Sequence, residues 1–178
     1  KAMIIFAVLS LLSGVGLLYE ALKDATWQTF AAFLSLGILS IIAAITYTAG
    51  KRPYGYAGLG DLSVLIFFGW VGVLGVYYLH THSLDWSLLL PATSCGLFAV
   101  CVLNINNIRD IESDTLTGKR SVPVRIGREK AIIYHWILLI LGMVCSIFYF
   151  FLHPGPLTQW LFILSFPLFV RNGLAVSS

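Results

Sequence analysis

Long apolar runs alternate with short polar segments along the whole chain, and this alternation predicts membrane-spanning helices. Most runs approach the roughly 20 residues that an α-helix needs to cross a bilayer. We expect six spans, at residues 2–18, 30–47, 62–79, 87–103, 131–152 and 157–170. The last is short and contains Pro167, so we expect it to be tilted, kinked or incomplete. Because an open sheet would leave unpaired edges in lipid, the expected fold is all-α, a polytopic transmembrane helical bundle forming a single domain.

Composition supports a membrane protein. Of the 178 residues, 58% are hydrophobic and 11% are charged, whereas a soluble domain carries about 25% charged residues. The three cysteines (Cys95, Cys101 and Cys145) lie within apolar runs and show neither metal-binding spacing nor a disulfide framework. The chain opens on Lys1 without the pattern of a signal peptide, and we interpret it as an interior part of a longer polytopic protein.

The basic residues indicate how the spans are oriented. With six spans, ten of the eleven Lys and Arg residues fall on one side of the membrane, and Lys23 alone falls on the other. Basic residues accumulate in cytoplasmic loops. The two long polar loops, at residues 48–61 and 104–130, are therefore predicted to face the cytoplasm.

The loop at 104–130 holds the strongest candidate chemistry. If the preceding helix continues through it, Asn107, Asp110 and Asp114 share one face, at positions i, i+3 and i+7. Carboxylate and amide oxygens suit Mg²⁺, which is usually shared with substrate phosphates. Nearby cations that can bind phosphates are Arg109, Lys119 and Arg120. The alternative to a metal and phosphate site is a solvated loop, basic only because cytoplasmic loops usually are.

The loop at 48–61 is irregular, because several glycines and Pro53 interrupt helix. Tyr47 contributes an aromatic face, and Lys51 and Arg52 contribute positive charge. Alone, this loop fits an interfacial aromatic belt better than a site. His80 and His82, at the opposite end of the next span, have the same interfacial explanation, with a metal site as the less favoured one.

The two loops together resemble a known family. The segments YTAGKRPYGYAGLGD (47–61) and NNIRDIESDTLTGKRSVPVRIG (106–127) are similar to the UbiA superfamily of intramembrane aromatic prenyltransferases. The likeness is nearly continuous over residues 40–127 and is greatest for members that prenylate 1,4-dihydroxy-2-naphthoate in bacterial menaquinone biosynthesis. It implies about nine helices around a central cavity, of which about six are present here.

The resemblance also implies two Asp-rich motifs that face each other. Asn107, Asp110 and Asp114 match the second motif and are the expected metal ligands. The first motif is absent and would precede Lys1, so this chain is expected to be inactive alone.

The implied reaction is Mg²⁺-dependent transfer of a polyprenyl group from its diphosphate to 1,4-dihydroxy-2-naphthoate, with decarboxylation, giving demethylmenaquinone. The implied location is the bacterial cytoplasmic (inner) membrane, with the active site facing the cytoplasm and no role for nucleic acid. Tyr47, Asp110 and Asp114 are the expected catalytic residues. Expected substrate contacts are Lys51, Arg52, Asp61, Asn104, Asn107, Arg109, Lys119 and Arg120. Asp61 is expected to orient a cation or accept from the acceptor hydroxyl, unless it serves as a helix N-cap.

Other functions stay open. Within the superfamily the acceptor could be 4-hydroxybenzoate, a tocopherol precursor or haem. The D-x-x-D-G-x-x-A-R pattern of phosphatidyl-alcohol transferases is not found here. A transporter or scaffold subunit is disfavoured, because the middles of the spans carry no Asp, Glu, Lys or Arg.

Overall fold

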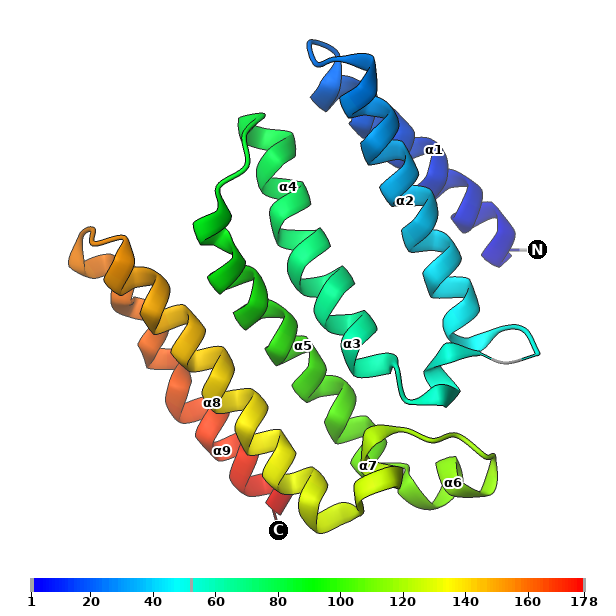
Figure 1. Ribbon diagram of the computed structural model, residues 1–178, viewed down its shortest axis with the longest axis vertical. Coiled ribbons are helices and arrows are strands. Elements are labelled where there is room, and N and C mark those ends of the chain that lie inside the picture. Colours follow the sequence, from blue (N-terminus) through cyan, green and yellow to red (C-terminus); the bar gives the residue numbers. More distant parts are fainter. Residues whose placement is uncertain (1, 52, 178) are drawn as a thin grey trace.

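The protein consists of helices joined by short connections (Figure 1). The structure is a computed structural model that describes residues 2–51 and 53–177, without the side chains of residues 2–4, 6, 7 and 10. The long helices are α1 (Ala2–Leu22), α2 (Trp27–Thr48), α5 (Leu89–Arg109) and α8 (Arg128–Leu152). One composite helix joins α3 (Gly60–Val64), η2 (Leu65–Val71) and α4 (Gly72–Thr81), and another joins η4 (Leu157–Ser165) and α9 (Phe166–Ser177). Short elements are η1 (Tyr54–Ala57), η3 (Trp86–Leu88), α6 (Ile111–Leu116) and α7 (Val122–Ile126).

Length and hydropathy mark this as a multi-pass membrane protein. Among the described residues, five helical stretches are long and apolar enough to span a membrane: Trp27–Thr48, Gly60–Thr81, Trp86–Arg109, Arg128–Leu152 and Leu157–Ser177. Many large apolar side chains on these helices are exposed, as lipid-facing side chains are. The expected fold class, an all-α polytopic bundle, is confirmed.

The best-packed part of the bundle is the interface of α5 with α8. Its core is formed by Leu97, Val100, Cys101, Leu138 and Leu139. A hydrogen bond crosses the same interface, since Ser94 Oγ donates to the carbonyl of Gly142 at 2.7 Å. α5 is therefore fixed against α8, and the polar segment that follows α5 begins from a well-packed helix.

A π-helical turn, η2, interrupts the helix that lies on the other side of α5. It brings Gly69 against α5 so closely that a Cβ there would lie 2.7 Å from the Ala92 carbonyl and 2.9 Å from Gly96 Cα. Small residues let membrane helices approach in this way, and π-turns often occur near functional sites. Apolar periodicity did not predict this turn.

The two polar segments lie at the same end of the bundle, called here the polar end (Figure 1). One is the connection from α2 to α3, and the other runs from the end of α5 through α6 and α7 to α8. The three short connections after α1, α4 and α8 lie at the opposite end. In the last stretch, 3₁₀-helix gives way to α-helix at Phe166, beside Pro167, which lacks the N–H that a regular helix would need.

Candidate active site at the polar end of the bundle

The segment after α5 bends at Asp110. α5 ends at Arg109, and Asp110 adopts φ −97° and ψ 12° before α6 begins. Helix-type hydrogen bonds still form at the bend, because the amide of Asp114 donates to the carbonyl of Asp110 at 2.8 Å. The continuous helix on which the shared face of Asn107, Asp110 and Asp114 depended is therefore divided into two helices.

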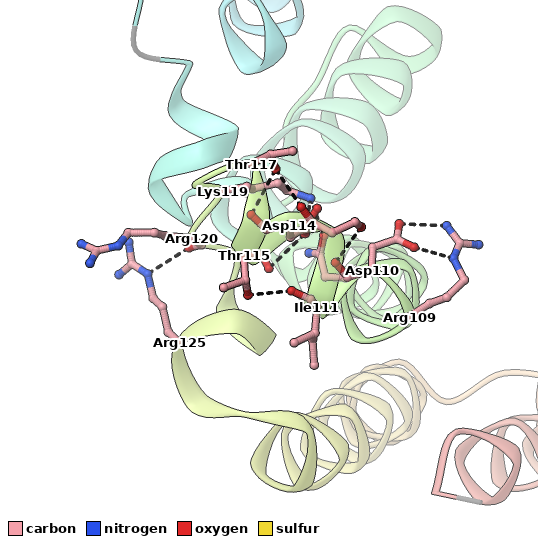
Figure 2. A network of polar contacts seen from close by, with 12 residues as sticks. Arg109, Asp110, Ile111, Asp114, Thr115, Thr117, Lys119, Arg120 and Arg125 are labelled. Carbon is pink, nitrogen blue, oxygen red and sulfur yellow. Dashed lines mark hydrogen bonds and ion pairs between the residues drawn. The ribbon is translucent and has the colours of Figure 1, made fainter.

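Asp110 turns toward Arg109 instead of toward Asp114 (Figure 2). Arg109 donates from Nε to Oδ1 at 2.7 Å and from Nη2 to Oδ2 at 2.9 Å. The guanidinium holds the pKa of the Asp110 carboxyl below its ordinary value, and the more distant Lys119 acts in the same direction. Asp110 is therefore a solvent-facing, cation-paired carboxylate at the edge of the site.

Asn107 and Asp114 converge on one cation, the ammonium of Lys119. Nζ of Lys119 lies 2.7 Å from Oδ2 of Asp114 and 3.0 Å from Oδ1 of Asn107. Asn107 and Asp114 are buried, with 4% and 9% of their surface exposed. The structure thus brings two of the expected site residues together around the ammonium of a third.

The turn after α6 aims Lys119 at this position. The amide of Lys119 donates to the carbonyl of Asp114 at 2.9 Å, which folds the chain back over the end of the helix. Gly118 has φ +74°, a left-handed conformation that glycine adopts without strain. Ser121 then donates a longer hydrogen bond, 3.4 Å, to Oδ2 of Asp114. The T-G-K-R-S sequence therefore closes α6 and sets the lysine in place.

Backbone contacts join the two polar segments. The amide of Arg120 donates to the carbonyl of Tyr56 at 2.9 Å. Arg125 reaches across from α7, donating to the Ala57 carbonyl and, at 3.0 Å, to the Arg120 carbonyl. Gly58 must be glycine, because its φ is +76° and a Cβ would lie 2.5 Å from the Arg120 carbonyl. Sequence reasoning did not assign Arg125 this role, since one arginine among several carries no distinguishing signal.

Tyr47 lies at the end of α2, where the first polar segment begins. Its ring packs edge-on against Tyr54, with 5.4 Å between the centroids. The glycine at position 60 leaves room for this ring, because a Cβ there would lie 3.1 Å from the Tyr47 hydroxyl. The aromatic face expected at this site is present beside the charged cluster.

An apolar cavity of about 510 Å³ adjoins Tyr47. It is lined by Ser40, Ala44, Tyr47, Tyr54, Ser63, Val64, Phe67 and Phe68, between α2 and the composite helix that contains η2. Tyr47 therefore lines this apolar cavity at the same end of the bundle as the charged cluster. The arrangement suits a ligand with an anionic head and a hydrophobic tail.

Asp61 and Lys51, which were also expected in the site, have other surroundings. Asp61 accepts a hydrogen bond from the hydroxyl of Tyr134 on α8 at 2.9 Å. The alternative in which Asp61 is the helix N-cap is wrong, because Leu59 holds that position. Lys51 is exposed just after α2. Arg52 lies outside the described residues.

Asn104 does not face the charged cluster. It is fully buried and donates to the carbonyl of Ala131 at 3.2 Å, inside the interface of α5 with α8. Its Nδ2 also lies 3.5 Å from Nδ1 of His135, which in turn contacts Asn172 on α9 through Nε2 at 3.2 Å. His135 is thus hydrogen-bonded within the bundle.

The donor atoms of the cluster fit a hard divalent cation. Asn107 Oδ1 and Asp114 Oδ2 already point at one cation, and Mg²⁺ prefers such oxygen ligands. No group of three or more His, Cys, Asp or Glu side chains that could hold a metal occurs in the described part of the chain. The residues that would hold such a cation in this arrangement are Asn107 and Asp114.

The chain is similar to several curated proteins. The chain is 52% identical to 1,4-dihydroxy-2-naphthoate octaprenyltransferase of Escherichia coli, with 97% of this chain and 55% of the relative covered. It is 48% identical to the protein of that name from Haemophilus influenzae, with 98% and 56% covered. A 2-carboxy-1,4-naphthoquinone phytyltransferase of Synechocystis is 28% identical, with 90% and 52% covered.

The chain spans about half the length of these curated relatives. No solved structure matches it. The family model described as "UbiA prenyltransferase family" matches residues 1–175. With that match and relatives near 50% identity over almost all of its length, this chain belongs to the UbiA prenyltransferase family.

Proposed function

We propose that the full-length protein transfers a polyprenyl group from polyprenyl diphosphate to 1,4-dihydroxy-2-naphthoate. The ring carboxylate leaves as CO₂, and the product is demethylmenaquinone in its reduced (quinol) form, an intermediate of menaquinone biosynthesis. The names of the similar proteins from E. coli and H. influenzae support this acceptor. The observation that carries the proposal is the convergence of Asn107, Asp114 and Lys119 beside Tyr47 and its apolar cavity.

The charged cluster would hold the diphosphate. Breaking the allylic C–O bond places negative charge on the leaving diphosphate, and cationic side chains stabilise that charge. Lys119 is in position to do so, while Arg109, Arg120, Lys51 and Arg52 are further candidates on the same two segments. When bound by Asn107, Asp110 and Asp114, Mg²⁺ would add Lewis-acid stabilisation of the leaving group.

Tyr47 and the apolar cavity would bind the isoprenoid part of the donor. The face of Tyr47 can stabilise a developing allylic cation by about 0.5–2 kcal/mol. The cavity beside it would bind the start of the isoprenoid chain and exclude water, which would otherwise hydrolyse that cation.

We further propose that the polar end faces the cytoplasm of a bacterium and that the bundle lies in its inner membrane. The basic residues of both polar segments support this orientation. We also propose that the chain is one helical domain, which supplies six of the roughly nine helices of the complete bundle.

The function can be tested with the purified full-length protein in lipid and a panel of acceptors. With polyprenyl diphosphate and Mg²⁺, we expect diphosphate release and a prenylated product from 1,4-dihydroxy-2-naphthoate, and at least 100-fold less from 4-hydroxybenzoate. Turnover with 4-hydroxybenzoate alone would move the protein to another branch of the family. Absence of metal-dependent diphosphate release with every acceptor would contradict the proposal and favour a transporter or scaffold.

A further inference from the structure

A second polar contact at the polar end joins α3 to α8 and is not needed to hold diphosphate. The hydroxyl of Tyr134 donates to Oδ2 of Asp61 at 2.9 Å, across 73 positions of the sequence. Both residues are half-buried, Asp61 in the first turn of α3 and Tyr134 in the second turn of α8. With Oδ2 bound to Tyr134, Oδ1 is the oxygen that can accept from a further donor.

Asp61 differs from the other two aspartates of the site in its partner. Asp110 is paired with Arg109, and Asp114 is paired with Lys119. Within residues 2–51 and 53–177, no Lys or Arg forms an ion pair with Asp61. A carboxylate next to a cation is a weak base, whereas one bonded to a neutral phenol keeps more of its basicity. Asp61 is therefore the aspartate of this group best suited to accept a proton.

The pair lies close to the reacting end of the proposed donor site. Tyr47 ends α2 next to the start of α3, the helix that carries Asp61. Gly60, the neighbour of Asp61, is packed directly under the Tyr47 hydroxyl. Asp61 therefore directly follows the residue that packs against Tyr47, the aromatic side chain proposed to face the developing allylic cation.

We infer that Asp61 is a catalytic base for the aromatic acceptor and that Tyr134 is its positioning residue. This inference rests on the proposed function. The acceptor O–H bond breaks, its proton goes to Oδ1 of Asp61, and the electron pair stays on the oxygen and spreads into the ring. The electron-rich ring carbon that bears the carboxylate then forms a bond to the allylic carbon, while the allylic C–O bond breaks and diphosphate leaves with that bond pair.

The remaining steps restore both the ring and the base. Loss of CO₂ returns its C–C bond pair to the ring, which becomes aromatic again. Asp61 then gives the proton back to the product oxygen and ends as the carboxylate. No oxidant or further reactant is needed. A purely structural tie between α3 and α8 is the competing explanation, and it predicts no dependence on acceptor acidity.

The test compares Asp61→Asn with the wild type in the full-length protein, using two acceptors. One is 1,4-dihydroxy-2-naphthoate, and the other is a ring-fluorinated analogue whose hydroxyl is more acidic. With the first, we expect kcat/KM for the acceptor to fall about 100-fold, the scale of general-base catalysis, while KM for polyprenyl diphosphate changes less than twofold. With the fluorinated acceptor, which ionises without help, the loss should shrink to about tenfold or less. An equal loss for both acceptors would overturn the inference.

Tyr134→Phe and Asp85→Asn complete the design. Tyr134→Phe should lower kcat/KM for the ordinary acceptor about tenfold and add little to Asp61→Asn, because coupled residues are not additive. Asp85 caps η3 at the opposite end through Ser87, so Asp85→Asn is a matched carboxylate control with wild-type activity.

If Asp61→Asn fails to fold, Tyr134→Phe alone decides, since equal losses for both acceptors would again overturn the inference. Failure of the proposed function would instead appear in the wild type, as absence of prenylated naphthoate.

Discussion

The ammonium of Lys119 lies 2.7 Å from a carboxylate oxygen of Asp114, and both side chains are largely shielded from solvent, with 20% and 12% exposed. The same ammonium lies 3.0 Å from Asn107 Oδ1. Lys119 therefore stands where a divalent cation would be bound by these two oxygens. A metal that binds there has to displace the ammonium, which is then free to reach a phosphate oxygen.

Lys119→Met should separate these two roles. Without a competing ammonium, the Mg²⁺ concentration for half-maximal activity should fall several-fold. KM for polyprenyl diphosphate should rise about tenfold, since a charge-assisted hydrogen bond contributes about 1.5–3 kcal/mol. Steady-state kinetics in lipid would measure both, with Lys130→Met at the exposed start of α8 as the control. If neither value changes, Lys119 is not part of the site.

Arg109→Gln should raise the pKa of Asp110. Its pKa is lowered in the folded protein, so the pairing stabilises the fold above the ordinary carboxyl pKa and is lost as pH falls through the lowered one. Selective ¹³C labelling of aspartate should show a higher midpoint for Asp110 in the variant. Asp85, whose pKa is lowered by hydrogen bonds from Ser87, should titrate unchanged. An unmoved Asp110 midpoint would contradict the pairing.

Arg125→Met should loosen the junction of the two polar segments. The variant loses the hydrogen bonds to the Ala57 and Arg120 carbonyls, each contributing about 1 kcal/mol. Hydrogen exchange should become faster in residues 54–60 and 118–126 and stay unchanged in α5. Arg128→Met, exposed at the start of α8, is the control. Equal protection in variant and wild type would show that the junction does not depend on Arg125.

Gly69→Ala should destabilise the bundle through the contact of η2 with α5. The added methyl would lie 2.7 Å from the Ala92 carbonyl, so backbone must move, at a cost of about 1–3 kcal/mol. Gly14→Ala, with no atom within 4 Å of the new Cβ, should be neutral or slightly stabilising. Thermal unfolding in detergent compares the two. Equal melting temperatures would mean that the close approach is not required.

Hydropathy was sufficient to predict the all-α membrane bundle and the long helices, because lipid requires apolar side chains over a fixed length. The side-chain geometry could not be predicted in this way. Asp110 departs from the expected stripe because its neighbour Arg109 binds it bidentately at a helix break. Tyr134 and Arg125 act across 73 and 68 positions of the sequence, a distance that no local spacing encodes. Asn104 resembles a site residue in sequence, yet it faces a helix interface.

The central claim is that the Asn107–Asp114–Lys119 cluster binds the metal and diphosphate. Its most direct test is Mg²⁺-dependent diphosphate release by the full-length protein carrying Asp114→Ala, with Asp110→Ala alongside and membrane insertion verified for both. We predict that Asp114→Ala removes at least 99% of the activity while the protein still inserts and folds. Near-normal release by the inserted Asp114→Ala protein would contradict the assignment of this site.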